Sequence, residues 1–137
     1  MGRLAPRLDI PITLAVYAFC LSRPRSDWLY LAGMVVAAAG FSLWIVARVQ
    51  LGGSFTVRPE ARALVTTGLY SRIRNPIYFF STVGLLAMCL GMRWFRWGGL
   101  YTAAVFLIQW RRSRAEAKVL EAAFGEQYLA YKAHTWF

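Results

Sequence analysis

Residues 28–47 form a run of 20 apolar or small residues that contains no charged side chain. A helix rises about 1.5 Å per residue, so a helical run of this length measures about 30 Å, the thickness of the hydrocarbon core of a bilayer. A charge-free segment of this length is typical of a transmembrane helix. We therefore expect a fold that places this segment in lipid.

Three further apolar segments predict additional spans. Residues 76–92 begin with Pro76, which is favourable in the first turn of a helix because its missing N–H needs no partner there. Residues 8–22 form a weaker span, because Asp9 lies near its edge. Residues 95–110 are short, and an interfacial helix is the alternative for them. We expect an all-α, polytopic membrane protein with about four transmembrane helices and a C-terminal amphipathic helix.

The basic residues are distributed unequally between the two sides that four spans define. The N-terminus, the loop 48–75 and the tail 111–137 fall on one side and carry 12 of the 16 Lys and Arg residues. The positive-inside rule places that side in the cytoplasm. This topology explains a net charge of +10 in a chain that is 58% hydrophobic. We therefore expect one integral membrane domain over residues 1–137.

Two other classes of partner are not indicated. No basic face is interleaved with aromatic residues for base stacking, so we expect no nucleic acid partner. Cys20 and Cys89 lie inside apolar runs, and the single histidine, His134, is near the C-terminus. A metal site needs several ligands, so we expect two buried thiols, a surface histidine and no metal. The sequence identifies no protein partner.

Small residues recur within the first long apolar run. Gly33 and Ala37 lie four residues apart, and Gly40 follows. Small residues at that spacing let two helices approach closely. The alternative is that these positions face no neighbouring helix.

A polar, doubly basic stretch directly precedes the apolar segment 76–92. Residues 68–78 read GLYSRIRNPIY, which places two arginines, an amide and two tyrosines at the mouth of the predicted helix. Ionisable groups beside a membrane are costly unless they contact something. The stretch is therefore the first candidate for a binding site.

The tail supplies the second candidate element. Its residues favour helix, and one apolar stripe recurs at intervals of three and four: Val119, Leu120, Ala123, Phe124 and Tyr128. Gly125 indicates a break or a bend. Arginine can hold a carboxylate by two hydrogen bonds, glutamate can accept from ribose hydroxyls, and tyrosines can line an adenine or a sulfonium. These residue types suit S-adenosylmethionine.

Both elements resemble motifs of the isoprenylcysteine carboxyl methyltransferase and phospholipid methyltransferase family of membrane enzymes. The family hallmark is Gly-Pro-Tyr, followed after three residues by Arg-His-Pro and after one further residue by Tyr. This chain has the same spacing, with Gly68-Leu69-Tyr70, then Arg74-Asn75-Pro76, then Tyr78. The second block appears as Glu116-Ala117, Leu120, Phe124-Gly125, Gln127-Tyr128 and Tyr131. The resemblance covers about residues 40–132.

The chain departs from the family pattern at three positions. Leu69 replaces the proline, which loosens the turn. Asn75 replaces a histidine, and its amide can donate a hydrogen bond but cannot store a proton at neutral pH. Ala117 replaces one of two paired glutamates and leaves Glu116 to act alone.

The resemblance implies a function and a set of site residues. It implies methyl transfer from S-adenosylmethionine, with S-adenosylhomocysteine as product, to a lipid-like acceptor that enters from the membrane. The expected catalytic residues are Arg74, which grips the methionine carboxylate or orients the acceptor, and Tyr78. The expected cofactor-binding residues are Leu64, Val65, Gly68, Tyr70, Asn75, Tyr78 and Glu116.

The nature of the acceptor separates several hypotheses. A carboxylate is already ionised and needs no base, so the missing histidine favours carboxyl O-methylation. The alternatives are a phospholipid amine N-methyltransferase, which shares the scaffold, and a non-catalytic membrane protein, which Asn75 and Ala117 support. A four-helix structural or transport subunit is a further alternative, although its spans should carry inward-facing ionisable groups near the bilayer centre.

Overall fold

The protein is represented by a computed structural model that describes residues 5–52 and 64–136. The regular secondary structure of these residues is helical apart from one isolated bridge near the C-terminus. Its elements in chain order are α1 (Ala5–Leu21), α2 (Trp28–Leu51), the 3-10 helix η2 (Gly68–Ser71), α3 (Pro76–Gly91), α4 (Phe95–Phe124) and α5 (Glu126–His134). The predicted all-α fold is therefore confirmed for these residues.

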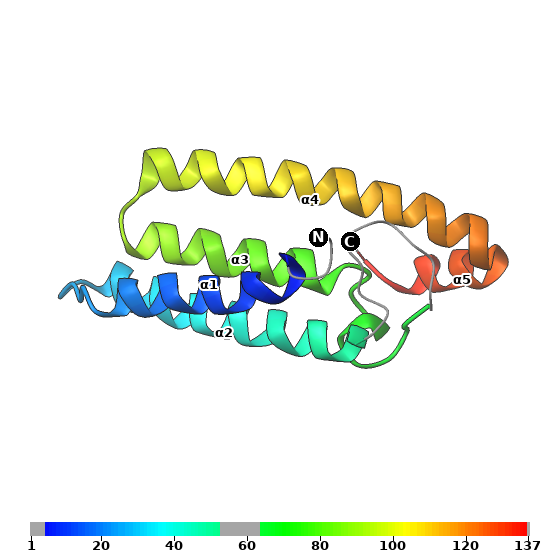
Figure 1. The fold of residues 1–137 in the computed structure, drawn as a ribbon, viewed down its shortest axis with the longest axis horizontal. Coiled ribbons are helices and arrows are strands. Elements are labelled where there is room, and N and C mark those ends of the chain that lie inside the picture. Colours follow the sequence, from blue (N-terminus) through cyan, green and yellow to red (C-terminus); the bar gives the residue numbers. More distant parts are fainter. Residues whose placement is uncertain (1–4, 53–63, 137) are drawn as a thin grey trace.

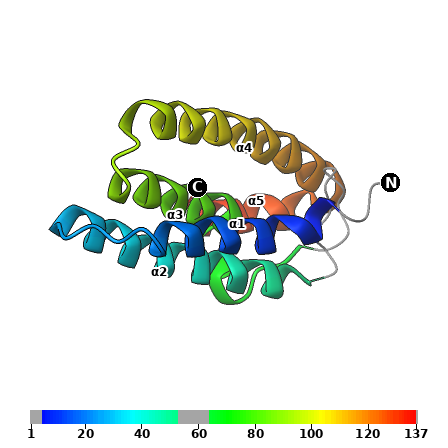
Figure 2. The same cartoon turned by 60° about the vertical axis from the view of Figure 1, so that its left-hand side comes forward.

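The four long helices run up and down along one axis (Figure 1). The α1–α2 and α3–α4 connections lie at the same end of the bundle in both views (Figures 1 and 2), whereas η2 and α5 lie toward the other end in Figure 1. This arrangement brings the junction before α3 and the tail to the same end. The hallmark residues and the tail motif are thus neighbours in space.

Helices α2 and α3 pack closely through their glycines. A Cβ atom on Gly33 would lie 2.7 Å from the Ala87 carbonyl oxygen, and one on Gly40 would lie 2.9 Å from the Gly84 Cα. Ala37, on the same face, is fully buried. The predicted role of these small residues in helix approach is confirmed, and α3 is the partner helix.

This contact makes Gly40 a sensitive position. We expect Gly40→Ala to lower the stability by about 1–3 kcal/mol, because the added methyl group meets the backbone of α3 and must push the two helices apart. The matched control is Gly99→Ala, since a Cβ there meets nothing within 4 Å. Thermal unfolding of both variants in detergent measures the difference. Equal melting temperatures would contradict close packing at Gly40.

Helix α4 is longer than the sequence indicated. The predicted span 95–110 and the predicted tail helix form one uninterrupted helix of 30 residues. Helix formers such as Ala115, Glu116 and Ala117 continue the backbone hydrogen bonds beyond the basic residues that start at Arg111. The predicted break at Gly125 is confirmed, because Gly125 has a φ of 50° and separates α4 from α5.

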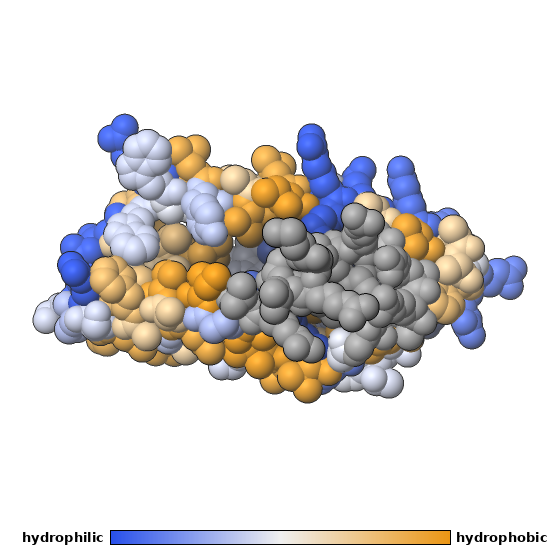
Figure 3. Space-filling model, viewed as in Figure 1, coloured by the Kyte–Doolittle hydropathy of each residue, from blue (hydrophilic) through white to orange (hydrophobic). Residues whose placement is uncertain are grey.

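One described helix, α2, is long and apolar enough to cross a membrane, while Asp9–Leu21 and α3 are shorter apolar helices. Large hydrophobic side chains are nevertheless exposed on α1, α2 and α4, among them Phe19, Val35 and Ile108. In the view of Figure 3, hydrophobic residues are visible to the left of the grey atoms and along the lower edge, and hydrophilic residues project at both ends and along the upper edge. All four predicted spans stay predictions, and α2 is the candidate that length and composition favour.

The remaining structural expectations concern three single residues. Cys20 and Cys89 are buried free thiols, as expected. His134 is exposed on α5, and its Nδ1 lies 2.8 Å from the Ala130 carbonyl oxygen. The surface role predicted for this histidine is therefore confirmed.

Candidate functional site

The junction before α3 is a tight turn that glycine and proline shape. Gly68 has a φ of 61°, a conformation that favours glycine, and a Cβ there would lie 2.5 Å from the Gln50 side chain. Gln50 Oε1 accepts a hydrogen bond of 2.9 Å from the Leu69 N–H. Pro76 is fully buried in the first turn of α3. These contacts fix where Tyr70, Arg74 and the start of α3 lie.

The C-terminal segment pairs with the backbone of this junction. The Arg74 N–H donates to the Trp136 carbonyl oxygen at 3.0 Å, and the Trp136 N–H donates to the Arg72 carbonyl oxygen at 3.0 Å. These two bonds flank the parallel bridge between Ile73 and Trp136. The Trp136 ring also meets Phe79 edge to face, with centroids 5.1 Å apart. The tail therefore fixes the backbone on both sides of Ile73.

Two tyrosines of α5 complete the contact. Tyr131 Oη donates a hydrogen bond of 2.7 Å to the Tyr70 carbonyl oxygen. Tyr128 is 1% exposed, which makes it one of the most deeply buried side chains among the described residues. Burial raises the pKa of Tyr131 to about 12, and the positive charge of nearby Arg74 opposes that rise. Tyr131 is therefore a neutral hydroxyl group at physiological pH.

Glu116 connects α4 to the start of α3. Tyr78 Oη donates a hydrogen bond to Glu116 Oε1. Arg112, one turn earlier on α4, lies 4.0 Å from the same oxygen, and its guanidinium lies over the Tyr78 ring at 5.6 Å. Burial raises the pKa of Glu116, whereas the Tyr78 hydrogen bond and the Arg112 charge oppose that rise. The three side chains form one polar contact between two helices.

Tyr70 carries an unsatisfied polar atom at this place. Within residues 5–52 and 64–136, Tyr70 Oη is a buried side-chain oxygen without a hydrogen-bond partner. Burial raises the Tyr70 pKa, the Glu116 charge adds to that rise, and the Arg48 charge opposes it. A buried polar group without a partner costs about 1–3 kcal/mol, so a bound polar ligand would offset this cost. The Tyr70 hydroxyl, the Glu116 carboxylate and the Arg74 guanidinium therefore fit a cofactor with hydroxyl and carboxylate groups.

The other predicted site residues surround this centre less closely. Leu64 and Val65 lie in the extended segment before η2, where both are half-buried and Val65 packs against the core. Asn75 precedes Pro76 and is half-buried, as is Arg74. Gly68 serves the turn described above. The roles of these residues in cofactor binding stay predictions.

Sequence reasoning missed two contributors to the site. Trp136 belongs to neither sequence motif, and its pairing with the junction depends on a fold that brings distant segments together. Arg112 was counted among the basic residues that set topology. Its spacing of four residues from Glu116 is the signal that could have identified it, because such pairs face each other on a helix.

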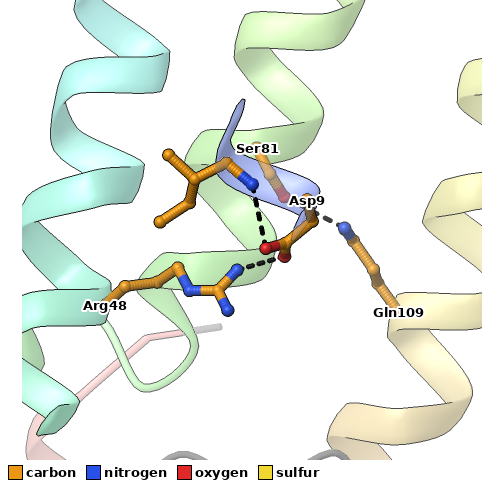
Figure 4. A network of polar contacts seen from close by, with 5 residues as sticks. Asp9, Arg48, Ser81 and Gln109 are labelled. Atoms are coloured by element: carbon orange, nitrogen blue, oxygen red, sulfur yellow. Dashed lines mark hydrogen bonds and ion pairs between the residues drawn. The ribbon is translucent and has the colours of Figure 1, made fainter. Parts of the chain in front are cut away.

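A second polar cluster lies between the four long helices (Figure 4). Asp9 of α1 forms an ion pair with Arg48 of α2. Gln109 of α4 donates a hydrogen bond of 3.0 Å to Ser81 of α3 and accepts one of 2.6 Å from Thr82. None of these residues belongs to the motif residues that the sequence singled out. The cluster buries the Arg48 side chain, which is 9% exposed, whereas the Asp9 side chain is 43% exposed.

Comparisons with known proteins identify the family. Searches against curated proteins and solved structures gave no match. The family model described as phospholipid methyltransferase matches residues 28–127, which is more than half of the chain and includes the junction and the Glu116 block. The chain therefore belongs to the phospholipid methyltransferase family.

Proposed function

We propose that this protein is an integral membrane methyltransferase that moves a methyl group from S-adenosylmethionine to a lipid-embedded acceptor. Family membership supports methyltransferase activity and, together with the apolar helix α2, membrane association. The observation that carries the proposal is the contact between the two motif elements. Tyr78 meets Glu116, and Trp136 pairs with the backbone on both sides of Ile73.

The residues around this contact suit the parts of the cofactor. Arg74 would hold the methionine carboxylate, since guanidinium and carboxylate form paired hydrogen bonds. Glu116 and the Tyr70 hydroxyl would meet the ribose hydroxyls. Leu64, Val65, Gly68 and Asn75 would line the remaining pocket.

The chain itself needs to supply little chemistry. When bound, the cofactor supplies a methyl group already activated by its positive sulfur. The protein contributes alignment and exclusion of water, and such positioning can supply about 7–11 kcal/mol of a barrier reduction. Tyr78 contacts Glu116 and also lines the cavity between the long helices, so it would orient the acceptor. The buried neighbours Pro76 and Ile77 exclude water beside it.

We favour a carboxylate as the acceptor. A carboxylate is ionised at neutral pH and attacks without a base, whereas an amine must first lose a proton. Asn75 cannot take that proton. Arg48 and Arg112 line the cavity beside Tyr78, and each already pairs with a carboxylate there, so a carboxylate is a head group that suits this lining. This is the O-methylation expected from the resemblance to isoprenylcysteine carboxyl methyltransferases.

A phospholipid amine is the second candidate, and a specific observation favours it. Burial raises the pKa of Glu116, and a carboxylate of raised pKa is a better proton acceptor. The description of the matching family also names phospholipids.

We further propose that α1, α2, α3 and the first half of α4 cross the membrane, with the junction and α5 on the cytoplasmic side. The common position of these two elements at one end of the bundle supports this topology (Figure 1). The unequal distribution of Lys and Arg supports the cytoplasmic location.

Methyl transfer to total lipid distinguishes the candidates. The purified protein is incubated with S-adenosylmethionine that carries a radiolabelled methyl group, and the lipid products are separated. We expect label in a base-labile ester. Label in a headgroup amine would establish the second candidate. Binding of S-adenosylhomocysteine without transfer to any acceptor would contradict both and indicate a non-catalytic membrane protein.

A further inference from the structure

The end of the tail is joined to the junction by contacts that are weak one by one. Trp136 forms two backbone hydrogen bonds to the junction, and its ring meets Phe79 edge to face. Tyr131 donates a further hydrogen bond to the Tyr70 carbonyl oxygen. Trp136 is nevertheless 54% exposed. A hydrogen bond or a ring pair of this kind changes an equilibrium by about two- to tenfold, so these contacts can open while the long helices stay folded.

The groups proposed to meet the cofactor are buried beside these contacts. Tyr70 and Tyr78 are both buried, and the Tyr70 hydroxyl oxygen is a buried atom. Arg74 lies close to Tyr131 on α5. A molecule of the size of S-adenosylmethionine therefore cannot reach the Tyr70 hydroxyl in this arrangement. An element beside the site must move before the cofactor can enter or leave.

Helix α5 has an anchored start and a glycine at its connection to α4. Tyr128, in the first turn of α5, is fully buried and holds this end of the helix in place. Gly125 separates the two helices with a φ of 50°, and a Cβ there would meet nothing within 4 Å. A glycine in open space lets the backbone rotate without collisions. The end of α5 can therefore tilt away from the junction while Tyr128 stays buried.

We propose that residues 131–136 form a gate over the cofactor site and that Trp136 is its latch. This inference rests on the proposed function and deepens it, because it assigns the step that controls cofactor exchange. In the closed form, Trp136 pairs with the backbone on both sides of Ile73 and so holds Arg74 in place. In the open form this pairing is released, and the cofactor enters or leaves beside Tyr70. A weaker latch raises the open population of the loaded and the unloaded protein by the same factor.

A gate requires that the association and dissociation rates of the cofactor change together. Both rates are measured for radiolabelled S-adenosylhomocysteine on the full chain in detergent. We expect Trp136→Ala to raise both rates about two- to tenfold and to leave Kd unchanged, because it removes the edge-to-face ring pair with Phe79. Trp136→Phe keeps an aromatic ring and should restore the parental rates. Trp28→Ala removes a largely exposed tryptophan of α2 and is the matched control, with parental rates expected.

Two further variants change the latch in opposite directions. Trp136→Pro also removes the N–H that bonds to Arg72, so both rates should rise further, and Thr135 already has the extended backbone that a residue before proline needs. Ile73 and Trp136 pair in a parallel bridge, and paired strands lie about 4.7–4.9 Å apart, within the Cα separation of a disulfide. In Ile73→Cys/Trp136→Cys, oxidation after loading should slow release of the label at least tenfold, and a reductant should reverse this. The parent under the same oxidant is the control, since Cys20 and Cys89 are buried.

Three results would overturn the proposal. If Trp136→Ala raises the dissociation rate alone and so weakens binding, Trp136 supports the bound cofactor and is not a latch. If Trp136→Ala and Trp136→Pro both keep the parental rates, the tail does not control exchange. Release from the oxidised double variant as fast as from its reduced form, with the cross-link verified by mass spectrometry, would also refute the gate. Misfolding is recognised separately, because it lowers the number of binding sites and does not raise both rates.

The same preparations separate this inference from the proposed function. A parent protein that binds no S-adenosylhomocysteine would contradict the proposed function. Amide hydrogen exchange tests the latch without any cofactor, because the Arg74 N–H donates to the Trp136 carbonyl oxygen and should exchange faster in Trp136→Ala. Binding of S-adenosylhomocysteine at rates that do not respond to the latch variants would contradict this inference alone.

Discussion

Replacing Arg74 by alanine is expected to abolish methyl transfer while leaving the protein folded. The Arg74 backbone N–H bonds to Trp136, and this bond survives the substitution because it does not involve the side chain. The guanidinium is half-buried close to Tyr128 and Tyr131, where a cofactor carboxylate would complete its contacts. Its loss should reduce kcat/KM by at least a hundredfold. Radiolabelled methyl transfer to the identified acceptor measures the effect.

The matched control is Arg72→Ala. Arg72 is exposed, and only its backbone carbonyl contacts Trp136, so the variant should keep parental activity. If Arg74→Ala is as active as Arg72→Ala, both arginines serve membrane orientation alone. Calorimetry then divides the roles left open for Arg74: loss of S-adenosylmethionine affinity indicates the carboxylate grip, and loss of kcat at unchanged affinity indicates orientation of the acceptor.

Replacing Glu116 by glutamine should weaken S-adenosylmethionine binding by about tenfold or more. Glu116 accepts the Tyr78 hydroxyl and faces Arg112, so its charge organises both side chains. A hydrogen bond to a charged group contributes about 1.5–3 kcal/mol, which corresponds to that loss. Calorimetry in detergent measures the affinity. Glu121→Gln, whose side chain is exposed on the same helix, is the control.

The same pair of variants predicts a pH dependence. Because burial raises the pKa of Glu116, its carboxylate takes up a proton at a higher pH than an ordinary glutamate does. Cofactor affinity of the parent should therefore fall on acidification before ordinary carboxylates titrate. Glu116→Gln should lack this step, and Glu121→Gln should keep it. Unchanged affinity and pH dependence in Glu116→Gln would remove Glu116 from the site.

The fold could be predicted where local rules apply. Pro76 begins α3, Gly125 separates α4 from α5, and Gly33 and Gly40 meet a neighbouring helix, each as the residue type requires. The continuity of α4 was missed because Arg111 and its neighbours change the polarity without changing helix propensity. The polarity of its residues decides whether a helix segment lies in lipid or in water, whereas helix propensity and capping residues decide where the helix ends.

The candidate site could be predicted in its residues but not in its contacts. Spacing and resemblance selected Tyr78 and Glu116, yet their hydrogen bond joins positions 38 residues apart. The Asp9–Arg48 pair and the bridge from Ile73 to Trp136 are likewise long-range. Such pairs depend on how helices pack, and no local pattern in a single sequence encodes them. In the sequence, Asp9 only weakens the first predicted span. The structure shows why an acidic residue stands there, because Asp9 forms an ion pair with Arg48.

The central claim is that the junction and the tail hold one S-adenosylmethionine molecule between them. Determining the structure with S-adenosylhomocysteine bound tests this claim most directly. We predict that the nucleoside contacts Tyr70 and Glu116 and that the amino acid carboxylate contacts Arg74. A nucleoside bound elsewhere, with Tyr70 Oη and Glu116 making no contact to it, would contradict the account.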